Sequence, residues 1–297
     1  MIERGFALRG PLELAATLAP LRHGLGDRTI RLARDEAWLA FRTHDGPATL
    51  CLRTDGALTL RARAWGRGAN TALDEVPALV GEEDEPERFV ARHPILRDLQ
   101  RRHAGLRLPR SRRILDALVP TIIEQKVTGI EAFRAYAALL RRYGEPAPGP
   151  ADLLLAPTAA ALAGLPYHAF HPLGVERRRA DVIRRASARA AWLEASADAG
   201  EAARRLSSLS GIGPWTVAEV LRPAFGDPDA VSVGDWHVPN TVAWALAREP
   251  RATDERMLEL LKPYLGQRGR VQRLLELGRI TAPRFGPRMA PRRIAAI

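Results

Sequence analysis

Residues 206–220, with the sequence L-S-S-L-S-G-I-G-P-W-T-V-A-E-V, are candidates for binding a phosphate oxygen. The pattern predicts an amphipathic helix that ends at a short Gly-x-Gly turn, and a second helix that begins at once with Pro214 near its first position. Glycine lets the backbone of such a turn approach a ligand closely, and the start of the second helix presents free N–H groups that can bind an anion. A Gly-x-Gly turn between helices is nevertheless more often structural, so the turn by itself does not establish a function.

Asp235 is the second candidate, because it stands at the start of a helix predicted over residues 235–247. It follows an irregular segment, V-S-V-G at residues 231–234. A carboxylate at a helix start is ordinarily an N-cap that accepts backbone N–H groups, and on spacing alone the cap is the preferred interpretation. His237 lies two residues further on, but it lacks partners at the spacing of metal ligands, which argues against a metal site.

The chain is strongly basic, with 45 Lys and Arg against 34 Asp and Glu and a formal net charge of +11. Such a balance suits a polyanionic partner, although basic surfaces also occur on proteins that bind none. Only Lys126 and Lys262 are lysines, so the other 43 basic residues are arginines. The basic runs at residues 101–103 and 177–179 are either solvated faces or flanks of a nucleic-acid site.

The first 85 residues predict a small α+β domain. A strand begins at residues 6–8, and helical spacing of apolar residues predicts a helix at 11–22. Alternating apolar and polar residues predict strands at 29–33, 38–43, 49–54 and 57–63. Asp-Gly pairs at 45–46 and 55–56 favour tight hairpin turns between these strands. We therefore expect an antiparallel meander flanked by a helix.

Beyond residue 85 the pattern becomes helical, so the predicted fold is mainly α. The acidic stretch G-E-E-D-E-P-E at residues 81–87 is expected to be a linker or domain edge. An all-α body is predicted over residues 86–282, with helices at 94–102, 112–127, 129–143, 151–163, 177–197, 202–209, 214–225, 235–247 and 254–266. The tail at residues 283–297 has no core-forming pattern and is expected to be a flexible basic segment.

Several classes of protein and site are excluded by composition. Cys51 is the only cysteine, so an internal disulfide, a multi-cysteine zinc site and a cysteine-held iron–sulfur cluster are ruled out. No apolar run approaches the ~18 residues that a membrane span needs, and the N-terminus lacks a signal-peptide pattern. We therefore expect a cytoplasmic protein without a membrane partner. A monomer is expected, because no exposed apolar repeat predicts an interface.

Two longer stretches resemble a known family. Residues 206–220 as a whole resemble the helix–hairpin–helix motif L-x-x-L-x-G-I-G-x-x-T-A, with Ser210 where the family usually has proline. H-A-G-L-R-L-P at residues 103–109 and V-P-T-I-I-E-Q-K-V-T at 119–128 are similar to the R-H-P-G-L-R-x-P and I-x-x-Q-x-V-S stretches of AlkA-type 3-methyladenine DNA glycosylases II. The chain thus resembles the helix–hairpin–helix (HhH-GPD) DNA glycosylases over roughly residues 90 to 280.

The resemblance implies a base excision repair enzyme with two helical lobes around an active-site cleft. Asp235 matches the family's catalytic aspartate, about twenty residues past the hairpin, although the family's G-P-D loop reads V-S-V-G-D here. The carboxylate would stabilise the oxocarbenium-like transition state as the N-glycosidic bond of a flipped base breaks. Members that also cut the DNA strand use a lysine where this chain has Trp215. A monofunctional hydrolase without AP-lyase activity is therefore expected, acting on alkylated purines in nucleoid-associated double-stranded DNA.

The resemblance also assigns residues to the parts of the site. The base pocket would be lined by Trp215, Tyr264 and Trp236, with Glu219 in place of a third aromatic residue. DNA would be contacted by Gly211, Ile212, Gly213, Thr216, Arg177, Gln125 and Lys126, of which Lys126 stands at the position of an apolar wedge. No cofactor is required, but backbone carbonyls of Ser207, Leu209 and Ile212 would hold a monovalent cation, K+ or Na+, at the hairpin.

Two alternatives stay open at this point. The first is a glycosylase for another class of lesion, such as deaminated or oxidised bases, which the departures at Glu219 and Lys126 allow. The second is a DNA-binding protein that keeps the fold but not turnover, since many helix–hairpin–helix units only bind phosphates. The presence of Asp235 argues against the second alternative. Lys126 itself could fill the gap left by the flipped base, bind a phosphate, or be a solvated charge at a helix end.

Overall fold

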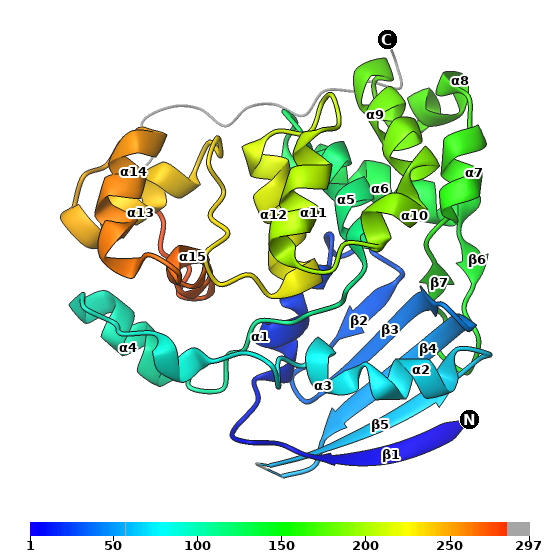
Figure 1. Ribbon diagram of the computed structural model, residues 1–297, viewed down its shortest axis with the longest axis horizontal. Coiled ribbons are helices and arrows are strands. Elements are labelled where there is room, and N and C mark those ends of the chain that lie inside the picture. The colour runs from blue at the N-terminus through cyan, green and yellow to red at the C-terminus, as the bar shows by residue number, and fades with distance from the viewer. Residues whose placement is uncertain (57, 284–297) are drawn as a thin grey trace.

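A computed structural model of the protein describes residues 1–56 and 58–283. Helices make up about half of it, and a five-stranded antiparallel sheet lies at the N-terminal end (Figure 1). The prediction of a mainly α fold with a small N-terminal α+β part is therefore confirmed. The basic tail is predicted over residues 283–297, and its residues after Pro283 lie outside the described ranges. No helix in the described ranges combines the length and apolar character needed to cross a membrane.

The sheet is a meander with one added strand. Its strands lie in the order β1-β5-β4-β3-β2, and every neighbouring pair is antiparallel. The first strand returns to pair with the last, with Ile2 opposite Ala64. The strand bounds are β1 Ile2–Ala7, β2 Ile30–Leu32, β3 Glu36–Thr43, β4 Gly46–Thr54 and β5 Thr59–Trp65. A core of buried residues beneath the sheet includes Leu50, Leu52 and Leu60.

The helices follow one another with short connections. Those associated with the sheet are α1 Leu14–Leu18, α2 Ala69–Asp74 and α3 Val76–Leu79. The rest are α4 Pro94–Arg102, α5 Ile114–Glu124, α6 Gly129–Tyr143, α7 Ala159–Gly164, α8 Tyr167–Phe170, α9 Arg177–Ala188, α10 Ala190–Glu194, α11 Ala199–Ser207, α12 Pro214–Phe225, α13 Val238–Ala247, α14 Asp254–Leu261 and α15 Arg268–Leu277. Short 3-10 turns lie at η1 Ala19–Leu21, η2 Pro86–Arg88, η3 His171–Leu173 and η4 Lys262–Tyr264. Two short strands, β6 Glu145–Pro146 and β7 Leu154–Leu155, pair with each other in antiparallel fashion.

The helical part has two cores, which define two lobes. The first lobe is built around α5, α6, α9, α11 and α12, with Phe170 and Ile122 fully buried. The second lobe consists of α4, α13, α14 and α15, with Val242 and Met257 fully buried. In Figure 1 the second lobe lies on the far side of α12 from the other helices of the first lobe. The irregular segment between α12 and α13 connects the two lobes.

Several predicted helices differ from those observed. The helix predicted at 151–163 begins only at Ala159, because residues 154–155 pair with residues 145–146 as strands and Thr158 caps the helix. The helix predicted at 177–197 is interrupted at Arg189. Helix α15 was not predicted, although Val271, Leu274 and Leu275 have helical spacing and are buried.

The acidic stretch at 81–87, predicted to be a linker or domain edge, makes buried contacts with distant parts of the chain. Asp84 and Arg270 form an ion pair in which the side chains are only 5% and 3% exposed. The other oxygen of Asp84 accepts the backbone N–H of Leu108 at 3.0 Å. Glu82 likewise pairs with Arg107, which is buried. Removing one partner of a buried ion pair lowers the free energy of unfolding by about 3–5 kcal/mol. The pair between Asp84 and Arg270 therefore holds α15 firmly against this stretch.

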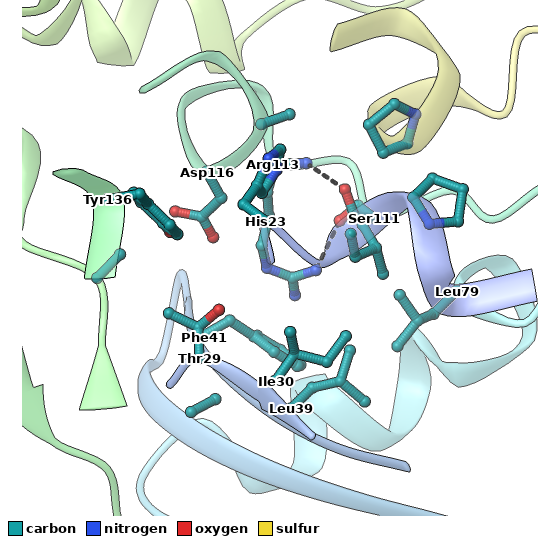
Figure 2. A pocket seen from close by; sticks show the side chains of 16 residues that line it. His23, Thr29, Ile30, Leu39, Phe41, Leu79, Ser111, Arg113, Asp116 and Tyr136 are labelled. Carbon is teal, nitrogen blue, oxygen red and sulfur yellow. Dashed lines mark hydrogen bonds between the residues drawn. The ribbon is translucent and has the colours of Figure 1, made fainter. Parts of the chain in front are cut away.

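A cavity of about 590 Å³, counted with the space at its opening, separates the sheet from α5 and α6 (Figure 2). His23, Asp116 and Tyr136 line it together with apolar side chains such as Phe41. Burial raises the pKa of Asp116, and it outweighs the opposing effect of two nearby arginines. The candidate residue Asp235 does not line this cavity.

His23 connects the segment before β2 to the end of α5. Its Nδ1 lies 2.9 Å from a carboxylate oxygen of Glu124, and its ring meets Tyr136 edge-on at 5.6 Å. Burial lowers the pKa of His23, but the hydrogen bond and charge of Glu124, with smaller effects of Asp27 and Glu219, raise it by more. The net pKa of His23 in the folded protein is therefore above its ordinary value.

This raised pKa predicts a pH-dependent contribution to stability. The contribution of His23 is fully present below the pKa of about 6.5 in the unfolded chain, and is lost as pH rises through the higher pKa of the folded state. We expect the free energy of unfolding of the wild type to exceed that of His23→Gln at about pH 6, and the difference to shrink by about pH 9. Chemical denaturation at several pH values measures this difference in the free energy of unfolding. His44→Gln, which changes an exposed histidine, is the control. A difference that does not change with pH would contradict the prediction.

Candidate active site

The predicted hairpin is present between α11 and α12. Gly211 adopts a left-handed backbone with φ 94°, and Gly213 precedes α12 without a side-chain cap on its first N–H groups. Ile212 is only 7% exposed and packs into the first lobe. Arg185 donates to the carbonyl of Ser210 at 3.0 Å, which holds the turn at the position where the resemblance predicted proline. The exposed turn and the uncapped start of α12 form a surface that can bind an anion.

Gln125 and Thr216, which are predicted to contact DNA, form hydrogen bonds that hold the hairpin from within. Nε2 of Gln125 donates to the carbonyl of Gly211 at 3.0 Å and to Oγ1 of Thr216 at 2.9 Å. Thr216 is 2% exposed, so its side chain cannot reach a ligand. Lys126 follows Gln125 in an exposed, left-handed conformation with φ 57°. The end of α5, which carries Lys126, is thus fixed to the hairpin.

The carboxylate of Asp235 accepts three hydrogen bonds. Oδ1 accepts the backbone N–H groups of His237 at 2.6 Å and Val238 at 2.9 Å, at the start of α13. Oδ2 accepts from Nε1 of Trp215 at 3.1 Å. Helix α13 begins at Val238, three residues later than predicted, and its N-cap residue is His237. Asp235 lies two residues before this cap, and its side chain accepts the first N–H groups in place of a cap side chain. Asp235 as a whole is partly buried.

The contact between Trp215 and Asp235 joins the two lobes. Trp215 is the second residue of α12, whose apolar side belongs to the first core. Asp235 lies between Val233 and Val238, which pack against the second core. The loop before Asp235 is held as well, since Gly234 N–H donates to both carboxylate oxygens of Asp254 at 3.1 and 3.0 Å. The geometry of the carboxylate therefore depends on how the lobes are placed.

Tyr264 and Trp236, which are predicted to line the base pocket, differ strongly in their exposure. Tyr264 is 6% exposed in the core of the second lobe, where its hydroxyl accepts the N–H of His93 at 3.1 Å and its ring packs on Phe89. Its ring therefore has little surface to offer a base in this conformation. Trp236 is 84% exposed and lies outside any described core. Of the predicted aromatic residues, Trp215 is the one in contact with Asp235.

Glu219 belongs to a polar network at the lobe boundary that sequence reasoning missed. Its carboxylate accepts from Arg222 at 2.8 and 2.7 Å and from the hydroxyl of Ser232. Across the boundary, Nη1 of Arg222 donates to Glu276 at 3.0 Å, and Nε2 of Gln272 donates to Ser232 at 2.8 Å and to Glu276 at 2.9 Å. We call Glu219, Arg222, Ser232, Gln272 and Glu276 the polar network. Because Gln272 and Glu276 lie on α15, which was not predicted, only their helical spacing could have indicated them.

Charge pairing keeps the network ionised. Burial opposes the ionisation of Glu276, but Arg222 and Arg273 outweigh it and lower the pKa of Glu276 to about 2. Burial also acts to lower the pKa of Arg222, while Glu219 and Glu276 raise it above its ordinary value. Gln272 links the network to the loop before Asp235, since its Oε1 accepts the N–H of Ser232 at 3.0 Å.

The remaining predicted residues are placed as follows. Arg177 is the first residue of α9, and its side chain is 77% exposed, with Tyr167 and Asp181 nearby. Ser207 ends α11, where carbonyl oxygens lack helical N–H partners. The Leu209 carbonyl accepts the N–H of Ile212 at 3.0 Å, which leaves it a second lone pair. Within the described residues, no group of three or more His, Cys, Asp or Glu side chains could hold a metal ion.

The hairpin geometry predicts that its two glycines tolerate alanine differently. A Cβ at Gly211 would lie 2.5 Å from Cγ2 of Val182, in a left-handed conformation that alanine rarely adopts, whereas a Cβ at Gly213 meets nothing within 4 Å. We expect Gly211→Ala to lower the free energy of unfolding by about 1–3 kcal/mol and to weaken binding of duplex DNA. Gly213→Ala, the matched control, should keep wild-type stability. Thermal unfolding and fluorescence anisotropy measure the two effects, and equal stability of both variants would refute this role of Gly211.

Solved structures with the same fold include DNA glycosylases. The 3-methyladenine DNA glycosylase from Archaeoglobus fulgidus matches with a TM-score of 0.77 and 18% identity, over 93% of this chain and 98% of that one. The 8-oxoguanine glycosylase/lyase of Clostridium acetobutylicum matches with a TM-score of 0.61 and 12% identity, over 85% and 99%. The 3-methyladenine DNA glycosylase of Schizosaccharomyces pombe, solved with abasic DNA, matches with a TM-score of 0.51 and 17% identity, over 66% and 96%. At these identities the likeness establishes a shared fold.

A family model identifies the superfamily. No significant match was found among curated protein sequences. The model for the HhH-GPD superfamily of base excision DNA repair proteins matches residues 119–266, about half of the chain, and this range contains the hairpin, Trp215 and Asp235. The chain therefore belongs to the HhH-GPD superfamily of base excision DNA repair proteins.

Proposed function

We propose that the protein is a monofunctional DNA glycosylase that hydrolyses the N-glycosidic bond of damaged purines in double-stranded DNA and leaves an abasic site. The observation that carries the proposal is the contact of Asp235 with Trp215 at 3.1 Å, next to an anion-binding hairpin. In the proposed function these elements supply a carboxylate, an indole and a turn that would bind a phosphate.

The hairpin would hold the DNA backbone. The N–H groups at the start of α12 point out of the protein, and phosphate contacts of this kind fix a duplex without reading its sequence. The net charge of +11 supports binding of a polyanion. Lys126 is exposed beside the hairpin, where it would enter the space left by the flipped base or bind a phosphate.

Asp235 would act on the flipped nucleotide. As the bond between base and sugar breaks, positive charge develops on the sugar, and a nearby carboxylate stabilises that charge in the transition state. Three hydrogen bonds hold the Asp235 carboxylate in place, so it need not reorganise during the reaction. An alkylated purine is already a good leaving group, so no strong general acid is required. Trp215 would also offer its ring as a stacking surface for an electron-poor base.

The absence of a lysine near Asp235 supports hydrolysis by water. Strand-cutting by this class of enzyme needs an amine that attacks the sugar and forms a Schiff base. Trp215 occupies the position at which the family pattern has that lysine. No lysine lies between Lys126 and Lys262 in the sequence, and neither of the two has a described contact with Asp235.

Two further parts of the proposal concern the lesion and a cation. Alkylated purines are the first candidates, because the sequence motifs resemble 3-methyladenine enzymes, and the similarity to an 8-oxoguanine glycosylase/lyase keeps oxidised purines as a second candidate.

The carbonyls of Ser207, Leu209 and Ile212 would bind a monovalent cation beside the DNA phosphate. Their free lone pairs at the end of α11 fit such an ion, which would add positive charge at the phosphate.

The proposal predicts base release without strand cleavage. Duplexes that each carry one alkylated, deaminated or oxidised base are incubated with the protein, and abasic sites are revealed with alkali. We expect cleavage of at least one damaged purine after alkali and none before it, and no covalent complex with DNA after borohydride reduction. If no lesion is released, the protein only binds DNA. A borohydride-trapped complex would instead show a lysine nucleophile, and Lys126→Ala would identify it.

A further inference from the structure

One face of α12 carries polar side chains beyond Trp215. Glu219 and Arg222 follow Trp215 by four and seven positions, so the three side chains share a face of the helix. With a rise of about 1.5 Å per residue, Glu219 lies about 6 Å further from the hairpin than Trp215. A base whose sugar lies beside Asp235 would therefore meet Glu219 with the edge that points away from the sugar.

Glu219 has one acceptor position left for a ligand. Its Oε1 accepts from Arg222 at 2.8 Å and from Ser232, whereas its Oε2 accepts only from Arg222, at 2.7 Å. A carboxylate offers about four acceptor positions, so among the described contacts one position on Oε2 is free. The Glu219 side chain is 21% exposed, which leaves this oxygen accessible.

Glu276 on the opposite lobe has a free position of the same kind. Its Oε1 accepts from Arg222 at 3.0 Å and Gln272 at 2.9 Å, and its Oε2 accepts from Arg273 at 3.3 Å. With about four positions on a carboxylate, one on Oε2 is unused in the described part of the chain. The side chain is 36% exposed. Arg222 donates to both carboxylates, so the two glutamates lie on either side of one guanidinium group at the lobe boundary.

The polar network has few donors left to offer. Both terminal nitrogens of Arg222 donate to the carboxylates, and the Gln272 amide donates to Ser232 and Glu276 while its oxygen accepts from Ser232. The charges of Glu219 and Glu276 are balanced by those of Arg222 and the neighbouring Arg273, so the formal charge of these four residues is zero. Selection among bases at this surface therefore depends more on the hydrogen-bond donors and acceptors of the base than on its net charge.

An acceptor surface distinguishes guanine from adenine. On the edge away from the sugar, guanine derivatives carry two adjacent donors, the ring N1–H and the exocyclic amino group. Adenine derivatives carry an amino donor beside an unprotonated ring nitrogen, which is an acceptor. An acceptor placed against a carboxylate loses its hydrogen bond to water without gaining another, and such an unpaired polar group is costly in a desolvated site.

We propose that Glu219 and Glu276 select damaged guanines over damaged adenines by accepting hydrogen bonds from the two adjacent donors of the guanine edge. The inference rests on the proposed glycosylase function, because it needs the base to lie between Trp215 and the polar network. It assigns Glu219 and Glu276 as specificity-determining residues, separate from the role of Asp235 at the sugar. Lesions that keep both donors, such as 7-methylguanine and 8-oxoguanine, fit this surface, whereas 3-methyladenine does not.

Exchange of Glu219 for glutamine tests the proposal. The glutamine amide keeps one acceptor oxygen but replaces the other with an N–H donor. This donor cannot pair with the guanine N1–H, which is also a donor, but it can donate to the unprotonated ring nitrogen of adenine. We expect Glu219→Gln to lower the single-turnover excision rate of 7-methylguanine about 10-fold or more. The rate for 3-methyladenine in the same duplex should fall by less than about 3-fold or rise. Glu259→Gln, which changes an exposed carboxylate on α14, is the matched control and should leave both rates unchanged.

The outcomes separate this inference from the proposed function. If wild type releases lesions but Glu219→Gln changes both rates equally, Glu219 is only structural and the inference is wrong. If wild type releases no lesion, the proposed function fails as well. Should Glu219→Gln not fold, as judged by thermal unfolding, Glu276→Gln at the more exposed position is expected to shift the ratio of the two rates in the same direction. An unchanged ratio in that variant would overturn the inference.

Discussion

The hydrogen bond between Trp215 and Asp235 is the contact on which the site depends, because its two partners belong to different lobes. The start of α13 supplies two N–H groups to the same carboxylate. Asp254 and the polar network hold the loop before Asp235 from two further helices. The buried pair of Asp84 and Arg270 then fixes α15 itself. The carboxylate is thus held by contacts that reach from the hairpin to the N-terminal third of the chain.

The net charge of the whole chain and the charged groups at the lobe boundary have different roles in the proposed function. The chain as a whole carries +11, which suits the phosphates of DNA. At the lobe boundary, in contrast, Glu219 and Glu276 are paired with arginines, and the pKa of Glu276 is held at about 2. In the proposed function, long-range attraction of DNA and short-range recognition of a base would therefore use separate groups. The first depends on ionic strength, whereas the second depends on local hydrogen bonds.

The sequence allowed the local elements of the site to be predicted, but not the contacts between distant residues. Helices α4, α6 and α12 have the predicted bounds, because proline, glycine and capping residues mark their ends. Asp235 lies three residues before the start of α13, where its carboxylate accepts the first N–H groups as a capping side chain would. Asp84 and Arg270 are 186 positions apart, and no local pattern indicates that they pair. The burial of Tyr264 and the internal hydrogen bonds of Gln125 likewise depend on packing between helices that the sequence does not specify locally.

The role of Asp235 in catalysis is the central claim, and Asp235→Asn tests it most directly. Asparagine keeps the size of the side chain and one acceptor oxygen but removes the charge that would stabilise the sugar cation. We expect the single-turnover rate on the lesion that wild type releases fastest to fall by about 10²-fold or more, with the affinity for the same duplex nearly unchanged. A variant that releases the base at the wild-type rate would contradict the account.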